Sequence, residues 1–414
     1  MTTPVVTTPA VEKAMDDLLR FRPEFPILAS STYLVSNSLG AMPRATGDRL
    51  AEYAEVWATR GVRAWADAWW ELPVRVGDEI APLIGAAANE VAMVANVSLA
   101  HVAVLSALDF AGGRDTIVMT ALDFPSVRYA VEGMAARLGA RVVVVPAAED
   151  GMSVDEDALC AAIDARTRLV AVSHVLFRSA YVMDAARIAR HAHDAGALVM
   201  LDAYHSVGVL AVDVRALGCD FLTGGVLKWL CGGPGGCFLY VAPDVEARAG
   251  RAVRPALTGW QAHARPFAFE DTMDHAAGAW RWLSGTPSVP ALYAALEGPR
   301  LVRAAGMPAV RAKSERQTAR LVALADARGY PVRAPRDPAR RGGTVAFDVP
   351  HGYEVAQELL ARDIVIDYRP GAGIRVAPHF YTTDDELEAA VAAIDEILAA
   401  GAWERHAGRR AVVT

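Results

Sequence analysis

The chain has 414 residues, of which 53% are hydrophobic and 21% are charged, and its formal net charge at pH 7 is −7. The length predicts two domains in close contact, while the negative charge excludes the broad basic surface of a nucleic-acid-binding protein. No apolar run is long enough to span a bilayer, and the first residues lack the features of a secretory signal, so we expect a cytoplasmic protein without a membrane partner.

Helical and strand patterns alternate through the middle of the chain. The predicted helices cover 90–111, 126–140, 154–164 and 184–197, and the predicted strands cover 115–122, 141–147, 168–175, 198–203 and 219–227. The strands are short, continuous apolar runs, which is typical of a parallel sheet covered by helices on both faces. The sequence therefore predicts an α/β fold.

The last third of the chain has a different pattern. A long helix over 289–329, with a break near Gly306–Pro308, leads to strands within 344–350, 365–370 and 373–378 and to helices over 354–363 and 384–399. This order predicts a small α+β C-terminal domain. We expect an N-terminal arm over 1–45 that contributes to the small domain and the substrate side, a large domain over 46–295, and a linker helix with the small domain over 296–414.

Polar segments follow three of the predicted strands, namely 123–126, 174–179 and 202–205. In an open parallel sheet, ligands bind outside the carboxyl ends of the strands. These segments should therefore meet at one edge of the sheet, where we expect the functional site.

The clearest candidates in that site are Asp202 and Lys228. Asp202 ends a predicted buried strand, and Lys228, one of three lysines in the chain, lies between an apolar run and the glycine-rich turn GGPGG. Taken alone, Asp202 could cap a helix and Lys228 could be a solvated surface residue. Together they are typical of a pyridoxal phosphate (PLP) enzyme, in which the lysine forms a Schiff base and the aspartate keeps the pyridine nitrogen protonated.

Longer stretches of the chain resemble kynureninase, a member of the fold type I superfamily of PLP enzymes, over nearly the whole length. The matching stretches include NSLGAMPRAT, HVLFRSA, LDAYHSVGVLAVDV, DFLTGGVLKWLCGGPGG, LTGWQAHARPFAFE, LSGTPSVPALYAALEG and IVIDYRPGAGIRVAPHFYTTDDEL. The resemblance implies a large PLP-binding domain with a mainly parallel, seven-stranded type of sheet between helices. It also implies a homodimer acting on a small amino-acid substrate.

The resemblance assigns roles to individual residues. Those implied to bind the cofactor are Val97, Ser98, Phe124, Asp202, His205, Lys228, Trp260 and Thr286. Of these, Lys228 is the implied catalytic residue, Phe124 covers a face of the cofactor ring, and Val97 and Ser98 hold the phosphate at a helix N-terminus. Trp260 and Thr286 match positions that reach the phosphate, often from the neighbouring subunit. Each of these residues could instead serve only packing or capping.

Three further residues are implied to bind substrate: Asn37, Trp65 and Arg375. Arg375 matches the arginine that grips the substrate carboxylate through two hydrogen bonds. It lies in an apolar stretch, so we expect its guanidinium to need an anionic partner.

Two single residues and one pair of residues depart from the kynureninase pattern. Leu227 stands where the family has a tyrosine that bonds the phosphate and takes part in proton transfer, and a leucine can do neither. Val127 replaces an acid, and Val35 with Ser36 replaces an Asp-Gly pair. A change of substrate, and of reaction, is the inference from these losses.

Two enzyme hypotheses therefore stand. The first is hydrolysis of the Cβ–Cγ bond of a kynurenine-type amino acid, as in tryptophan catabolism, to alanine and an aryl carboxylate. The second is a PLP-dependent C–S or other β-eliminating lyase, or another class V aminotransferase-like enzyme, of specialised metabolism. A non-catalytic homologue is a third hypothesis, which the retention of Asp202, Lys228 and Arg375 disfavours.

The cysteines bear on these hypotheses. The four are Cys160, Cys219, Cys231 and Cys237, so none follows 237, and a desulfurase with a persulfide-forming cysteine near its carboxylate-binding arginine is disfavoured. Their spacings match no metal site, and free thiols in a reducing cytoplasm are expected.

Overall fold

The computed structural model describes residues 17–408. Its main feature is a seven-stranded sheet whose strands follow the spatial order β2-β8-β7-β6-β5-β3-β4. The strands are β2 (Val91–Val94), β3 (Thr116–Thr120), β4 (Arg141–Val145), β5 (Thr167–Ser173), β6 (Leu198–Asp202), β7 (Phe221–Gly225) and β8 (Cys237–Val241). All neighbouring strands pair in parallel except that β8 runs antiparallel to β7 and to β2. The predicted α/β fold with a mainly parallel sheet is confirmed.

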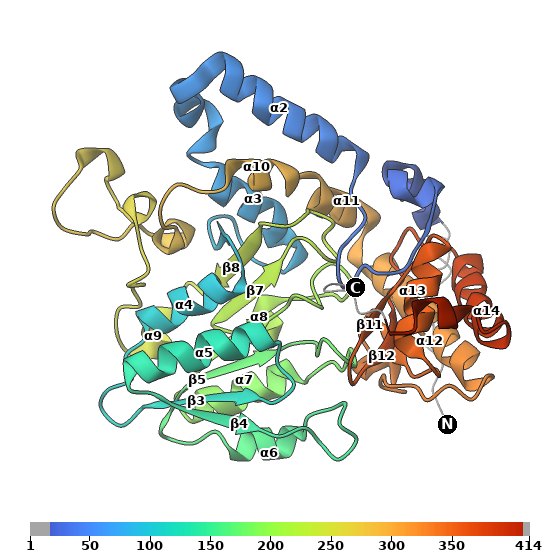
Figure 1. Ribbon diagram of the computed structural model, residues 1–414. Coiled ribbons are helices and arrows are strands. Elements are labelled where there is room, and N and C mark those ends of the chain that lie inside the picture. Colours follow the sequence, from blue (N-terminus) through green and yellow to red (C-terminus); the bar gives the residue numbers. More distant parts are fainter. Residues whose placement is uncertain (1–16, 409–414) are drawn as a thin grey trace.

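Helices surround this sheet (Figure 1). The α-helices between residues 44 and 305 are α2 (Arg44–Arg60), α3 (Leu72–Ile80), α4 (Val97–Ala107), α5 (Pro125–Leu138), α6 (Glu156–Ala161), α7 (Ala185–Asp194), α8 (Val214–Leu217), α9 (Val245–Ala249), α10 (Val289–Ala294) and α11 (Glu297–Ala305). Helices α4 and α5 pack on each other, and α7 packs against β6. Apolar residues of these elements form one large buried cluster.

One predicted helix is wrong in its first part. We expected a helix over 90–111, but Val91–Val94 form strand β2, and helix α4 begins only at Val97. The break lies at Asn96, whose backbone is extended and whose side chain accepts a hydrogen bond from the Leu99 amide. This capping bond starts the helix anew, and pairing with β8, a strand the sequence analysis did not predict, holds the preceding segment extended.

The C-terminal part of the chain has its own buried cluster. A three-stranded antiparallel sheet, in the order β11 (Asp367–Arg369), β12 (Gly373–Val376) and β9 (Val345–Phe347), packs with α12 (Met307–Asp326), α13 (Gly352–Ala361) and α14 (Asp384–Ala399). The expected helix break occurs at Gly306, whose φ is +85°, and a second break separates α10 from α11. Helix α14 starts with a capping box between Thr383 and Glu386, as its sequence favours.

The N-terminal segment joins this C-terminal part. Strand β1 (Thr32–Tyr33) pairs in parallel with β10 (Ile364–Val365), and Val35 forms a bridge to Ala377. Of the expected arm over 1–45, residues 1–16, with Lys13, lie outside the described residues. Within 17–408, no helix is long and apolar enough to cross a membrane, and no cluster of His, Cys, Asp or Glu could hold a metal ion.

Candidate active site

Lys228 lies three residues beyond the end of β7, at a turn within the segment 226–236 that leads to β8. Its Nζ is 2.7 Å from Nε2 of His205. Burial is the main cause that lowers the pKa of Lys228, and the nearby Asp202 carboxylate acts in the opposite direction. Burial, followed by the charge of Lys228, also lowers the pKa of His205 well below its ordinary value. The pair is therefore a neutral imidazole beside an amine that gives up its proton readily.

The segment 35–41 passes directly over this lysine turn. The Gly40 amide donates to the Leu227 carbonyl at 2.7 Å, and a Cβ at Gly40 would lie 2.1 Å from the Lys228 carbonyl oxygen. Only glycine permits this approach. Asn37, in the same segment, is buried, and both polar atoms of its side chain are without a hydrogen-bond partner among the described residues.

Asp202 is the last residue of β6 and is buried. Its Oδ1 accepts a hydrogen bond from the Tyr204 amide at 2.9 Å. Burial raises the pKa of the Asp202 carboxyl, Lys228 opposes the rise, and a second buried carboxylate, Asp123, adds to it. Asp123 accepts hydrogen bonds from the Thr120 amide and hydroxyl and from the Ser173 amide. Two carboxylates and one amine thus share the carboxyl edge of the sheet.

Aromatic rings border the lysine. The centroid of the Phe124 ring is 5.8 Å from Lys228 Nζ, and that of Tyr204 is 5.4 Å away. Phe177 packs edge-on against Phe124, with ring centroids 5.2 Å apart. Phe124 remains 39% exposed, so part of its ring is open to a ligand.

The N-terminus of α4 offers an anion site close to this edge. Asn96 caps the Leu99 amide, and the Val97 and Ser98 amides, in the first turn, have no partner within the helix. Free amides at a helix start, together with the helix dipole, favour a phosphate group. These residues fit PLP. The cofactor requires an amine, a carboxylate, an aromatic face and an anion site, and this edge of the sheet offers all four.

Arg375 is buried, and its anionic partner within the chain is Asp367. Nε donates to Asp367 Oδ1 at 2.8 Å, and Nη2 donates to Oδ2 at 2.5 Å. Nη1 donates to the Phe177 carbonyl at 2.6 Å, which ties the arginine to the aromatic border of the site. Asp367 and Arg375 are direct cross-strand neighbours on β11 and β12. The anionic partner expected for the Arg375 guanidinium is therefore the Asp367 carboxylate of the same chain.

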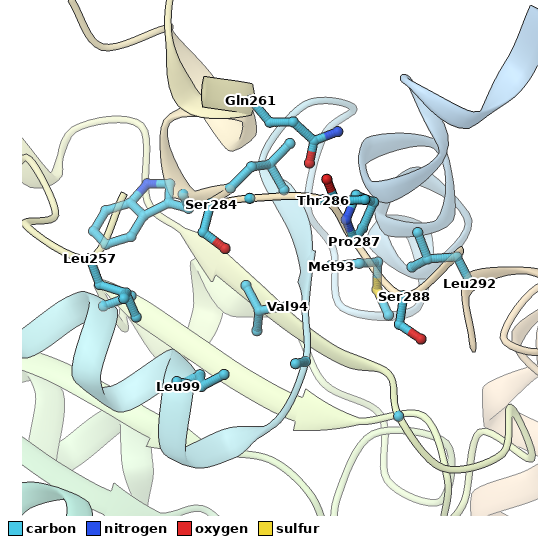
Figure 2. Close-up of a pocket in the computed structure, with 16 residues that line it drawn as sticks. Met93, Val94, Leu99, Leu257, Gln261, Ser284, Thr286, Pro287, Ser288 and Leu292 are labelled. Carbon is cyan, nitrogen blue, oxygen red and sulfur yellow. The ribbon is translucent and has the colours of Figure 1, made fainter. Parts of the chain in front are cut away.

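The remaining predicted residues lie apart from Lys228 in this chain. Trp65 is half-buried and packs edge-on against Trp69, with centroids 5.5 Å apart. Trp260 packs against Trp70, with ring centroids 4.7 Å apart. It lies in a segment between α9 and α10 that projects away from the helices and the sheet (Figure 1). Thr286 lines a cavity of about 170 Å³ together with Gln261, whose buried amide has no partner among residues 17–408 (Figure 2). No described contact joins these residues to Lys228.

Three residues of the site were not singled out from the sequence. Asp123 and Tyr204 were expected only as parts of the polar segments 123–126 and 202–205, and Asp367 was not expected at all. A cross-strand partner such as Asp367 can be recognised only when the register of β11 and β12 is known. Tyr204 lay beside two predicted residues, but nothing local showed where its ring would point.

Comparisons with known proteins show the family to which the chain is similar. The family model of aminotransferase class-V matches residues 32–383. Kynureninase from Burkholderia mallei (strain SAVP1) is 33% identical over 401 residues, which cover 94% of each chain, and kynureninase from Pseudomonas fluorescens is 33% identical over 405 residues with the same coverage.

Similar solved structures share the fold. The apo structure of cysteine desulfurase from Thermococcus onnurineus NA1 has a TM-score of 0.79 at 22% identity, covering 92% of this chain and 98% of that one. A complex of the cystine C–S lyase C-DES with cysteine persulfide has a TM-score of 0.79 at 23% identity, covering 89% and 98%. A variant of that lyase with glycine covalently linked to its PLP cofactor has a TM-score of 0.81 at 22% identity, covering 90% and 98%.

Proposed function

The chain belongs to the aminotransferase class-V family as a kynureninase-like, PLP-dependent enzyme of fold type I, and from this premise we propose that it hydrolyses the Cβ–Cγ bond of a kynurenine-type amino acid. The reaction consumes one water molecule and yields alanine and an aryl carboxylate. The observation that carries the proposal is that one site combines a lysine amine of lowered pKa, a buried aspartate and a buried arginine beside an open aromatic face.

When bound, PLP acts as an electron sink for the charge that develops at the substrate α-carbon. Lys228 would hold the cofactor covalently and, once released by substrate, would move the α-proton, because its lowered pKa leaves a neutral amine near neutral pH. The Asp202 carboxylate would keep the ring nitrogen protonated. His205, neutral and 2.7 Å from the amine, would orient it.

The other roles follow from position. The amides at the start of α4, at Val97 and Ser98, would hold the phosphate, and Phe124 would cover the ring. Arg375 retains a second N–H on each of Nη1 and Nη2, and these could bind the substrate carboxylate while Asp367 holds the other side of the guanidinium. Asn37 and Trp65 would border the substrate, and the free side-chain amide of Asn37 offers the two N–H donors of Nδ2 and the acceptor Oδ1.

A C–S or β-eliminating lyase is the second candidate, and Leu227 is the observation that favours it. Its side chain offers no donor to a phosphate and no proton to a leaving group. A reaction that needs no such hydroxyl, such as loss of a thiol from the β-carbon, is compatible with this residue. A class V enzyme acting on another amino acid remains part of this candidate.

We also propose a homodimer in the reducing cytoplasm. The projecting segment between α9 and α10 exposes Trp260, Phe267 and Phe269, an apolar surface suited to a second copy. In a dimer, Trp260 and Thr286 would reach the phosphate site of the neighbouring subunit, which accounts for the lack of a described contact between them and Lys228 in their own chain. The four cysteines are buried and unpaired, as expected in a reducing compartment. Light scattering should give the mass of two chains.

The reaction is tested by offering kynurenine, 3-hydroxykynurenine and a panel of cysteine-derived amino acids to the holoenzyme. Release of anthranilates and alanine supports the hydrolase, and release of pyruvate or sulfur products supports the lyase. Spectral changes with other amino acids, but no turnover of either kynurenine, would overturn the hydrolase proposal. The variant Lys228→Ala should lose the visible absorbance band of the covalently held cofactor.

A further inference from the structure

Tyr204 lies within the site although no proposed role uses it. It follows Asp202 by two residues, and its backbone amide donates to Asp202 Oδ1 at 2.9 Å. Its ring centroid is 5.4 Å from Lys228 Nζ, slightly closer than that of Phe124. The residue is half-buried, so the ring lies at the wall of the site.

The neighbouring chain makes room for this ring. A Cβ on Gly225, the last residue of β7, would lie 2.1 Å from Cε1 and 2.5 Å from Cζ of Tyr204. The same point is 2.8 Å from a methyl carbon of Leu227. Any larger residue at 225 would expel the ring, because real Cβ contacts are not this short. The tyrosine ring and the Leu227 side chain therefore share the space above Gly225, immediately before the lysine.

The position of the Tyr204 hydroxyl is the second observation. Burial is the main cause that raises the pKa of the hydroxyl. The Cys237 thiol raises this pKa further and the Val97 backbone amide lowers it, which places both groups near the hydroxyl. The strand register agrees, because Cys237 pairs with Gly225, beneath the ring, and with Val94, three residues before Val97. Val97 is the first residue of α4, so the hydroxyl is located at the helix start to which the phosphate is assigned. The ring spans the distance between the lysine turn and this anion site.

The chemistry of the hydroxyl suits an anion. Burial raises the pKa of Tyr204, so the hydroxyl keeps its proton throughout the working pH range and can act as a donor. The Cys237 thiol, whose pKa burial raises to about 11, is neutral and a weak acceptor. A phosphate oxygen is a much stronger acceptor, and hydrogen bonds to it are charge-assisted.

We propose that Tyr204 is a ligand of the cofactor phosphate and supplies, from the turn after β6, the hydroxyl that position 227 lacks. This inference rests on the proposed phosphate site at the start of α4. It adds a binding residue to that site and explains how an apolar Leu227 is compatible with a tightly held cofactor. Gly225 is then a required partner of Tyr204, since it admits the ring.

The test compares affinities for PLP and for pyridoxal, which lacks the phosphate. Both dissociation constants are measured by absorbance on native protein freed of cofactor, on Tyr204→Phe, and on the control Tyr240→Phe. Tyr240 is a buried tyrosine of β8 whose hydroxyl accepts a hydrogen bond from Arg215, so the control loses a hydroxyl outside the site. A lost hydrogen bond to a charged group corresponds to a roughly 10- to 100-fold weaker affinity.

We expect Tyr204→Phe to weaken PLP binding by roughly this factor and to leave pyridoxal binding within about threefold of native. Tyr240→Phe should change neither affinity. An unchanged ratio of the two affinities, or tighter PLP binding by Tyr204→Phe, would overturn the proposal. The second outcome would mean that the hydroxyl occupies the phosphate site itself.

A second substitution tests the same replacement of one hydroxyl by another in a different way. Leu227→Tyr should strengthen PLP binding more in the Tyr204→Phe background than in the native one, because only there is a hydroxyl missing. Equal effects in both backgrounds would show that the two positions act independently. They would refute the proposal that the Tyr204 hydroxyl replaces the one missing at position 227. No substrate is present in these measurements. Failure of the native enzyme to hydrolyse kynurenine would therefore overturn the proposed reaction without affecting this inference.

Discussion

Lys228 Nζ and His205 Nε2 lie 2.7 Å apart at the carboxyl edge of the sheet. Burial lowers the pKa of both groups, and the charge of Lys228 lowers that of His205 further. Two cations at this distance would repel each other strongly in a buried site. The stable arrangement is a neutral imidazole hydrogen-bonded to the amine, which orients the lysine, while burial makes the lysine easily deprotonated.

The first prediction concerns the pH dependence of cofactor attachment. The neutral amine is the nucleophile. Because the pKa of Lys228 is lowered from its ordinary value of 10.5, the attachment rate should rise with pH and level off well below that value. The rate is followed by absorbance after PLP is added to cofactor-free protein at a series of pH values. A rate that still rises about tenfold between pH 8 and pH 9 would show a lysine of ordinary pKa.

The second prediction concerns the free energy of unfolding of the cofactor-free protein. The folded pKa of Asp202 is raised, so its ionisation opposes folding once the pH exceeds the unfolded value of 3.8, and the penalty is complete above the folded pKa. Asp202→Asn should therefore stabilise the cofactor-free protein at pH 8, by about 1–3 kcal/mol, while weakening cofactor binding. Urea unfolding measures the first effect and absorbance titration the second.

Asp220→Asn is the matched control for this experiment. Asp220 is also fully buried, but it pairs with Arg248 and His193 and accepts a hydrogen bond from the Val199 amide. Removing its charge leaves Arg248 without that partner and should destabilise the protein. Stabilisation by both substitutions, or by neither, would contradict the assignment of a raised pKa to Asp202.

The third prediction concerns the segment over the lysine turn. Gly40→Ala places a methyl group 2.1 Å from the Lys228 carbonyl oxygen and 2.9 Å from Cys231 Sγ, so the segment must move. We expect a loss of stability of about 1–3 kcal/mol and weaker cofactor binding. The control is Gly47→Ala in α2, where a Cβ meets nothing within 4 Å. There alanine should stabilise the helix by about 0.5–1 kcal/mol. Equal effects of the two substitutions would refute the close approach at Gly40.

The fourth prediction concerns the ion pair of Arg375 with Asp367. Asp367→Ala leaves a buried guanidinium without its carboxylate, which should cost about 3–5 kcal/mol of folding free energy in urea unfolding. The exposed pair of Arg333 with Asp348 serves as the comparison, and Asp348→Ala should cost at most about 1 kcal/mol. If Asp367→Ala costs no more than Asp348→Ala, solvent or another anion compensates Arg375.

The sequence determined much of this fold because its strands are apolar runs and its helices have clear limits. Asp202 was expected at a strand end and is the last residue of β6, and the helix expected over 384–399 is α14. Strand β2 was missed because VAMV precedes a helix-forming run without a glycine or proline between them. Its extended state depends on pairing with β8, which lies far along the chain.

The same limit applies to the site. Lys228 and Arg375 could be found because a charge within an apolar stretch needs a reason. Asp367 and Tyr204 could not be found in this way. The role of Asp367 depends on the cross-strand register, and that of Tyr204 depends on the space above Gly225. Trp260 and Thr286 were assigned by resemblance alone, and a single chain does not bring them to Lys228.

The last prediction concerns the choice of reaction at Leu227. Its methyl carbon borders the same space as the Tyr204 ring, so a tyrosine at 227 would place a second hydroxyl near the lysine. Leu227→Tyr should raise kcat/KM for kynurenine about 100-fold, the lower end of the range expected of one proton-transferring group, or about 2.7 kcal/mol in transition-state free energy. Leu227→Phe, with the same ring and no hydroxyl, is the control. If both variants change kcat/KM equally, the shape of the pocket and not the missing hydroxyl limits the reaction, and the lyase becomes the better candidate.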